Sequence, residues 1–114
     1  MSVIVPNKEE FNQIIVDYFA GKLKGQKPRN VPEDDQIVLV HSSSMVALHL
    51  AVFIKKKYIP YITNVGSDFL PLGFGQMLGS KGAISVNFDL GGMRMLFINC
   101  HLDAHAYAFE KRNK

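Results

Sequence analysis

The chain has no tryptophan, and Cys100 is the single cysteine among its 114 residues. One cysteine excludes a disulfide within the chain and favours a reducing compartment. The longest apolar run, Met45 to Ile54, is interrupted by His49 and is shorter than the roughly 20 residues that a membrane-spanning helix needs. The N-terminal residues lack the basic and apolar segments of a secretory signal. We therefore expect a cytoplasmic protein.

Positive charge exceeds negative charge only slightly, since the net charge is +3 and charged residues make up 20% of the chain. With 47% hydrophobic residues, the composition is typical of a globular protein with one domain and one modest core. The basic residues gather in residues 22–29, 55–57 and 111–114. Such patches suit anionic partners such as phosphates or lipid headgroups, although solvated loops explain them equally well.

The first 35 residues predict a helix followed by a loop. Acidic residues occupy the expected first helical turn, and Phe11, Ile14, Ile15 and Tyr18 then have helical spacing. We expect an amphipathic helix from Glu9 to Leu23. Glycines and prolines interrupt the next segment, so Lys24 to Asp35 is predicted to be a surface loop.

The middle of the chain contains short segments rich in β-branched and apolar residues. Gln36–Ser42 and Val46–Ile54 fit two adjacent antiparallel strands joined at the serines of residues 42–44, and a short helix over Met45–Phe53 remains an alternative. Tyr61–Gly66 predicts a third strand. The segment Asp68–Leu78 combines proline and glycine with apolar side chains, which predicts an apolar loop that either folds under the core or faces an apolar partner.

The most regular pattern lies between residues 84 and 101. Apolar and polar residues alternate from Ile84 to Leu90, which is typical of a half-buried strand, and Gly91-Gly92 then suits a tight hairpin. Met93–Cys100 is apolar at nearly every position and predicts a central strand covered on both faces. Polar side chains appear at its end, in Asn99-Cys100-His101, where a strand can hold a site rigidly.

The remaining histidines and carboxylates predict no metal site. His41 and His49 lie within apolar strands and are expected to be hydrogen-bonded packing residues. His101 and His105 are four residues apart but have no third ligand nearby, and the carboxylates form no cluster in the sequence. Residues 103–114 predict a helix with Asp103 as its N-cap. The helical pattern runs to the last residue, so we expect the chain to be part of a larger domain.

Several motifs in order resemble the inositol polyphosphate 5-phosphatases of the endonuclease/exonuclease/phosphatase superfamily. The motifs are LVHS (39–42), VFIKK (52–56), YITNV (61–65), GSKGA (79–83), FINCHLDAH (97–105) and EKRN (110–113). The resemblance covers residues 36–114, whereas residues 1–35 match weakly. It implies an α/β (α+β) fold: a partial two-layer β-sandwich of mostly antiparallel strands with flanking helices. Residues 1–114 would form one partial domain, a central fragment of the catalytic domain.

The resemblance also implies a reaction and a set of site residues. Members of the family remove the 5-phosphate of an inositol with the help of magnesium. His101 matches the active-site histidine that binds the scissile phosphate, and Asn99, Lys81 and His105 match supporting positions. Ser80 and Asp103 replace the asparagine and alanine usual in the family.

Other parts of the family's machinery are missing from the sequence. The Trp-x-Gly-Asp-x-Asn and Pro-x-Trp-Cys-Asp-Arg motifs are absent, and no glutamate ligand is recognisable in residues 1–35. We therefore expect a catalytically incomplete chain that binds magnesium only as part of the complete domain and contributes no metal ligand of its own.

The same residues leave two alternatives. The chain would be a non-catalytic module that binds phosphoinositides or a membrane, or one part of a split enzyme completed at its sheet edges by another chain or a second copy. In either case a phosphoinositide or inositol polyphosphate is the expected ligand, and nucleic acid is not. The membrane-contact candidates are Lys55, Lys56, Lys57, Phe69, Leu70 and Phe74.

Overall fold

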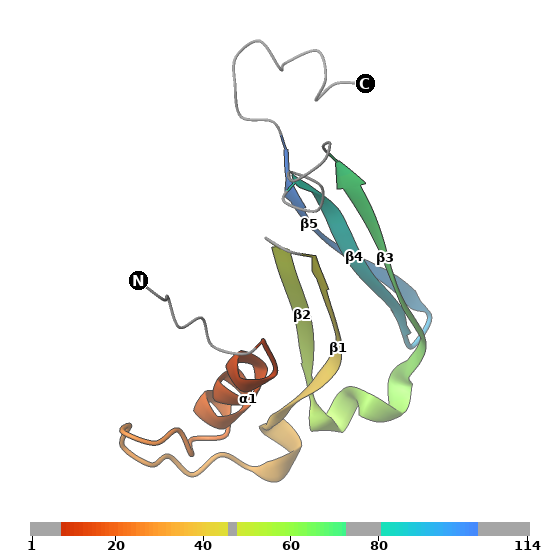
Figure 1. The fold of residues 1–114 in the computed structure, drawn as a ribbon. Coiled ribbons are helices and arrows are strands. Elements are labelled where there is room, and N and C mark those ends of the chain that lie inside the picture. Colours follow the sequence, from red (N-terminus) through yellow and green to blue (C-terminus); the bar gives the residue numbers. More distant parts are fainter. Residues whose placement is uncertain (1–7, 46–47, 73–80, 103–114) are drawn as a thin grey trace, which may run out of the picture.

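The computed structural model describes residues 8–45, 48–72 and 81–102, which form one α-helix, two short 3₁₀ helices and five strands (Figure 1). In chain order these are α1 (Lys8–Phe19), η1 (Glu33–Asp35), β1 (Ile37–Met45), β2 (Leu48–Lys55), η2 (Lys56–Tyr61), β3 (Ile62–Leu72), β4 (Lys81–Leu90) and β5 (Met93–His101). The predicted helix of residues 103–114, with Asp103, lies outside the described residues.

The helix α1 ends at Phe19 and not at the predicted Leu23. Gly21 has φ +75°, a left-handed conformation that glycine adopts readily. The amide of Gly21 donates to the carbonyl of Tyr18, and that of Lys22 donates to Asp17, which is the bonding pattern of a Schellman cap. A side chain on Gly21 would also collide with the carbonyl of Arg29, 2.3 Å from its Cβ. The glycine therefore stops the helix.

The strands β1 and β2 form a two-stranded antiparallel sheet, as predicted. Strand pairing extends from Ile37↔Lys55 to Met45↔Leu48, which excludes the alternative of a helix over the second segment. The serines at 42–44 are part of β1, so the prediction that they form the turn is wrong. Serine is compatible with either structure, and strand pairing decides between them here.

The second sheet has the order β3-β4-β5, with both pairs antiparallel. Gly91-Gly92 forms the predicted tight turn between β4 and β5. The prediction of a loop from Asp68 is wrong for residues 68–72, which continue β3 against β4. Pro71 is tolerated because β3 is an edge strand of this sheet, where one side of the backbone needs no partner. Residues 73–78, including Phe74, lie outside the described residues.

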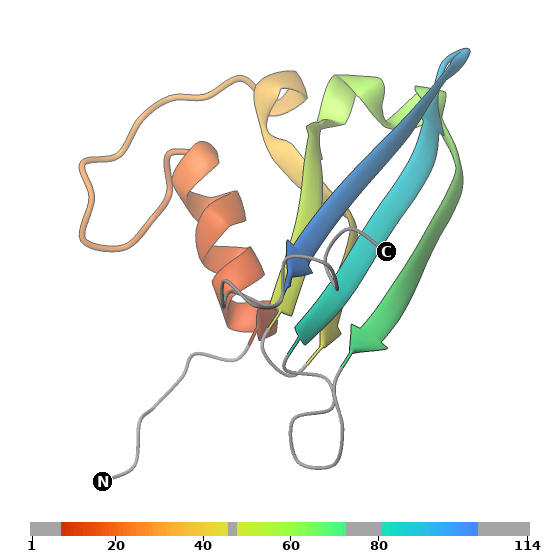
Figure 2. The ribbon, with the colours of Figure 1, turned by 90° about the horizontal axis from the view of Figure 1, so that it is seen from above.

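The two sheets pack face to face, and α1 lies beside the β1–β2 sheet on its far side (Figure 2). Val52 of β2 and Val86 and Phe88 of β4 form the buried core between the sheets. Half-buried apolar residues from all five strands pack around this core: Val40, Leu50, Ile62, Leu90 and Met95. The described residues thus confirm the predicted α/β class and the two-layer sandwich of antiparallel strands.

Two apolar surfaces are more exposed than the sequence predicts. β5 was expected to be covered on both faces, yet among the described residues it is an edge strand, and Leu96 and Ile98 are each 60% exposed. In α1 the buried position is Asn12, and Ala20 just after the helix is also buried, whereas most of the apolar stripe of the predicted amphipathic helix faces outward. Of that stripe, Phe11, Ile14 and Tyr18 are exposed and Ile15 is half-buried; Phe19, at the end of the helix, is also exposed. No helix in the described part of the chain has the length and hydropathy to cross a bilayer.

We predict that Gly82→Ala destabilises the sandwich. Gly82 has φ +144°, and an added Cβ would lie 2.1 Å from the carbonyl oxygen of Leu70. Backbone strain of this kind costs about 1–3 kcal/mol of unfolding free energy, which chemical denaturation measures. Gly92→Ala is the matched control, because its Cβ meets no atom within 4 Å, and we expect a change within about 0.5 kcal/mol. Equal losses in the two variants would contradict the prediction.

Candidate functional site at the end of the second sheet

The predicted catalytic histidine lies at the last position of β5. His101 pairs with Gly82, and Asn99 pairs with Ile84. Directly paired residues share a face of the sheet, so Asn99 and His101 lie on the inner face that carries the buried Ile84 and Val86. His101 is exposed while Asn99 is half-buried. The strand therefore presents the imidazole at the rim of the sandwich, just beyond the core.

Asn99 connects this end of β5 to the other sheet. Its side-chain amide Nδ2 donates a hydrogen bond to the backbone carbonyl of His49 in β2, at 2.9 Å. A hydrogen bond between the two layers fixes the separation of β5 and β2 two residues before His101. Asn99 therefore positions the strand, and its predicted role in supporting a phosphate stays a prediction.

His49 is held by a polar network between α1 and the first sheet. Its Nε2 lies 3.1 Å from Oδ1 of Asn12, and its Nδ1 lies 3.0 Å from the Ser44 hydroxyl. An amide oxygen only accepts, so Nε2 carries the proton and Nδ1 accepts from Ser44. Burial, and to a lesser extent the charge of Lys8, lowers the pKa of His49 below its ordinary value. The network thus favours neutral imidazole.

The two strand histidines are hydrogen-bonded, as predicted. Besides the His49 network, Nε2 of His41 in β1 lies 3.1 Å from the Ser67 hydroxyl of β3. This contact also crosses from one sheet to the other. Both histidines therefore connect structural elements and are not gathered into a site with His101.

Lys81 lies close to His101 along the sheet but on the other face. It precedes Gly82, the partner of His101, and begins β4 opposite Leu72. Because side chains alternate between faces along a strand, the register places Lys81 on the outer face and His101 on the inner one. Lys81 and His101 therefore lie at the same end of the second sheet, on opposite faces of it. His105 lies outside the described residues.

The lysines at 55–57 are engaged in ion pairs with the acidic residues of η1. Lys57 Nζ lies 3.1 Å and Lys55 Nζ 3.7 Å from the Asp35 carboxylate, and Lys56 lies 3.4 Å from Glu33. The hydrogen bond and charge of Lys57 lower the pKa of Asp35, and Asp35 in turn raises the pKa of Lys57. This basic patch is therefore largely neutralised by its own chain.

Phe69 and Leu70 do not join these lysines in one surface. Phe69 pairs with Ile84 and Leu70 with Ala83, so they lie on opposite faces of β3. Phe69 is seven residues beyond Ile62, at the start of β3, which separates it from η2 by roughly 20 Å. The structure thus does not bring together the two halves of the predicted membrane contact.

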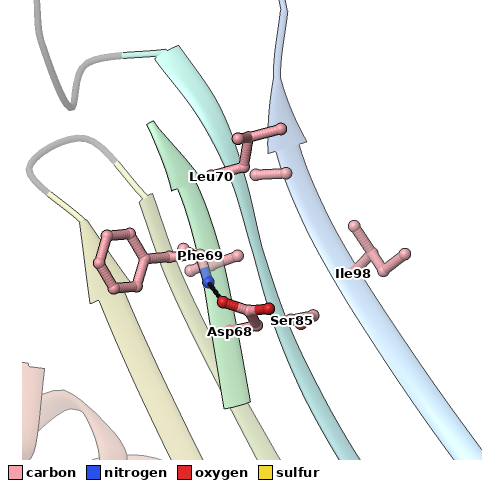
Figure 3. A pocket seen from close by; sticks show the side chains of 7 residues that line it. Asp68, Phe69, Leu70, Ser85 and Ile98 are labelled. Carbon is pink, nitrogen blue, oxygen red and sulfur yellow. Dashed lines mark hydrogen bonds between the residues drawn. The ribbon is translucent and has the colours of Figure 1, made fainter. Parts of the chain in front are cut away.

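A cavity of about 190 Å³ lies across β3, β4 and β5 near Leu70 (Figure 3). Ala83, Ile84 and Ile98 contribute apolar surface to it, and its polar groups are the Ser85 hydroxyl and the Asp68 carboxylate, which accepts a hydrogen bond from the Phe69 amide at 2.8 Å. A carboxylate repels an anion, so this cavity suits apolar side chains better than a phosphate.

The described residues do not fit a divalent metal ion. Within residues 8–45, 48–72 and 81–102, no three or more His, Cys, Asp or Glu side chains gather closely enough to hold an ion. Asp89, the carboxylate nearest the β4–β5 turn, is occupied by hydrogen bonds from Asn64 at 2.7 Å and Arg94 at 3.1 Å, which lower its pKa. Magnesium needs oxygen ligands, usually carboxylates, and this part of the chain assembles no such set.

Comparison with known proteins identifies the family. Residues 5–114 match the family described as endonuclease/exonuclease/phosphatase family 2. The chain belongs to this family. It is 31% identical over 85 residues to type II inositol polyphosphate 5-phosphatase 15 of Arabidopsis thaliana, a match that covers 75% of this chain. It is 37% identical over 75 residues to phosphatidylinositol 4,5-bisphosphate 5-phosphatase A of Homo sapiens, covering 66% of the chain.

The chain is much shorter than these family members. It spans 8% of the length of each of the two relatives. Its fold is similar to the inositol polyphosphate 5-phosphatase domain of SPsynaptojanin, crystallised with inositol (1,4)-bisphosphate and calcium ion, with a TM-score of 0.72 and 24% identity. That match covers 93% of this chain and 28% of the solved one, and it confirms the fold.

Sequence reasoning missed the partners that hold the site. Asn12 and Ser44, which orient His49, carried no signal, because one lies in a helix among apolar residues and the other in a serine run. The need for glycine at position 82 was also missed, although glycine within a strand pattern indicates a close backbone approach.

We predict that the His49 network makes stability depend on pH. The folded state lowers the pKa of His49, whereas the unfolded chain binds the proton at the ordinary value near 6.5. The unfolded state therefore binds more protons as the pH falls from about 8 to about 5, and the free energy of unfolding decreases. Thermal unfolding across this range should show a shallower decline for His49→Gln than for the wild type. His41→Gln leaves the network intact and should keep the wild-type slope; identical slopes in all three proteins would refute this origin.

Proposed function

We propose that this chain is part of an inositol polyphosphate or phosphatidylinositol phosphate 5-phosphatase, in which the complete domain hydrolyses the inositol 5-phosphate. The observation that carries the proposal is the placement of His101. It is exposed and is the last residue of β5, whose preceding residues contact the core and the opposite sheet. The names of the relatives support the same substrate class. The cytoplasm, with peripheral contact to membranes, is the location that suits such a substrate.

In this proposal each residue acts through its position on the sheet. His101 donates an imidazole N–H to a phosphoryl oxygen and stabilises the charge that develops there during hydrolysis. Asn99 holds the strand through the carbonyl of His49, so that the imidazole is positioned before the substrate binds. Lys81 supplies positive charge from the outer side of the same rim, and His105 completes the supporting set.

The chain alone is proposed to be catalytically incomplete. The complete domain uses magnesium, and tight binding of that ion requires carboxylates that the described residues do not gather. The hydrogen-bonding group of His101 is thus present without a complete set of metal ligands beside it.

We expect the purified chain to release no phosphate from inositol 1,4,5-trisphosphate in the presence of magnesium, as measured by phosphate release. It should still bind the substrate weakly, and His101→Ala should reduce that binding, seen as the loss of ligand-induced shifts at residues 99–101 in NMR spectra. His41→Ala removes a histidine far from the rim and is the matched control. Robust turnover that His101→Ala abolishes would refute the incompleteness, and shifts unaffected by His101→Ala would refute the site.

A second candidate function, one part of an enzyme completed by another polypeptide segment, is favoured by the surface of β5. Met93, Leu96 and Ile98 are each at least 60% exposed on this edge strand, which has unpaired backbone groups along one side among the described residues. An open apolar edge of this kind is a template for a further strand. The complement would cover the cavity beside Ile98 and bring the missing carboxylates.

We expect Leu96→Lys, on the exposed face of β5, to abolish association through this edge. Because Leu96 is already 60% exposed, the substitution should change the unfolding free energy by no more than about 0.5 kcal/mol. Sedimentation velocity would measure self-association of the chain, and co-purification would measure capture of a separately expressed remainder of a relative's domain. Unchanged association in Leu96→Lys, or its equal loss in the control Val65→Lys on β3, at the other side of the sheet and 44% exposed, would contradict the assignment.

A further inference from the structure

We propose that α1 and the basic loop after it (residues 22–29) form a surface that docks onto an anionic lipid bilayer. This surface is distinct from the rim that carries His101, and the inference does not rest on catalysis. It joins two features that the proposed function leaves unused: the outward apolar stripe of α1 and the basic residues of the loop.

The apolar half of this surface is the outer stripe of α1. Phe11, Ile14 and Tyr18 are spaced by three and four residues, so they lie along one face of the helix, and Phe19 packs edge-on against Tyr18 with ring centroids 5.3 Å apart. Each of these side chains is between 44% and 49% exposed. Asn12 is the buried residue of the helix and is hydrogen-bonded to His49 of the first sheet, and Ile15 and Val16 are half-buried. Phe11 also packs edge-on against the ring of His49, with centroids 6.4 Å apart, so Ile14 and Tyr18 are the side chains of the stripe that are left for an outside partner.

The polar half of this surface is the basic loop. Residues 22–29 carry Lys22, Lys24, Lys27 and Arg29 and no acidic residue. Among the described residues none of these four side chains has a carboxylate partner, in contrast to Lys55, Lys56 and Lys57, which all do. The charge of the loop is thus uncompensated by ion pairs within the described residues, whereas that of residues 55–57 is partly compensated.

The loop is joined to the apolar stripe at Tyr18. The Arg29 amide donates a hydrogen bond to the carbonyl of Gly21 at 3.1 Å, which joins the two ends of the loop. The Arg29 guanidinium donates to the Tyr18 carbonyl and lies 5.3 Å from the centroid of the Tyr18 ring. A cavity of about 290 Å³ opens between them, with Gln26 and Lys27 also in its wall. Aromatic and aliphatic side chains thus lie directly beside a positively lined hollow.

The charge decides which partner fits. An apolar helix face beside lysines suits a membrane interface, where the apolar side chains enter the headgroup boundary and the cations contact anionic lipids. Here the cations come from the loop, since α1 itself carries Glu9, Glu10 and Asp17 against Lys8. A second copy of this chain would place one positively charged loop against another if it bound through the same surface, which is unfavourable. We therefore assign the surface to an anionic bilayer.

Vesicle sedimentation of the full chain tests the assignment. The probes are phosphatidylcholine vesicles with and without phosphatidylserine, and binding should require the anionic lipid. Lys24→Gln/Lys27→Gln removes two charges and should weaken binding roughly tenfold to thirtyfold, given the contribution of each lysine near an anionic surface. Ile14→Ser should weaken it about tenfold through lost apolar contact. These side chains are exposed, so the variants should fold normally, and circular dichroism verifies this.

The matched control is Lys55→Gln/Lys57→Gln, which lowers the net charge by the same amount in the ion-paired patch. We expect it to retain binding within about twofold, because Lys55 and Lys57 belong to β2 and η2, outside the proposed surface. Equal weakening of the two double variants would overturn the assignment, because net charge alone would then explain binding. Binding of soluble inositol trisphosphate that Lys24→Gln/Lys27→Gln abolishes, without vesicle binding, would overturn it in favour of a soluble anion. Self-association that Ile14→Ser abolishes, without vesicle binding, would overturn it in favour of a second copy.

Discussion

The packing of the inner face of β4 against the first sheet is the constraint on which the rest of the structure depends. Ile84, Val86 and Phe88 are the most deeply buried apolar residues of β4, and Val86 and Phe88 form the core with Val52 of the opposite sheet. Burial of each such side chain contributes about 1.5–3 kcal/mol. Among the described residues, β4 is also the only strand of the second sheet with a neighbour on each side. Its orientation therefore determines which residues of β3 and β5 face inward.

The position of His101 depends on this orientation. With Ile84 buried, the antiparallel register places Asn99 inward, and the residue two positions later shares that face. The apolar core ends near Ile84, so Asn99 meets the backbone of β2 and His101 meets solvent. A shift of the register by one residue would bury Cys100 and turn both polar side chains outward. The placement of the histidine is therefore a consequence of core packing, supplemented by one hydrogen bond between the layers.

The sequence predicted those elements whose pattern is local, and it failed where the outcome depends on neighbours. The alternation in residues 84–90 and the Gly91-Gly92 turn can be recognised in the sequence, and the structure confirms both. Pro71 suggested a loop, but its edge position lets β3 continue past it. A motif led to the proposal of His101, whereas the contact from Asn99 to His49 joins residues 50 positions apart, which no local pattern encodes. The Asn12–His49 contact is similarly non-local.

The apolar residues of α1 and β5 show why exposure alone does not reveal the partner of a surface. Both elements have sequences that predict burial, and both leave large apolar side chains outside. Around β5 the nearby charges, Asp89 and Arg94, are paired with each other, so the surface that remains is apolar with open backbone groups and suits another segment of protein. Beside α1 the described cations of residues 22–29 have no carboxylate partner. An apolar protein segment would leave these charges uncompensated. An anionic bilayer would satisfy both the apolar and the charged groups. The pairing of the neighbouring charges, more than the apolar area, therefore distinguishes the two surfaces.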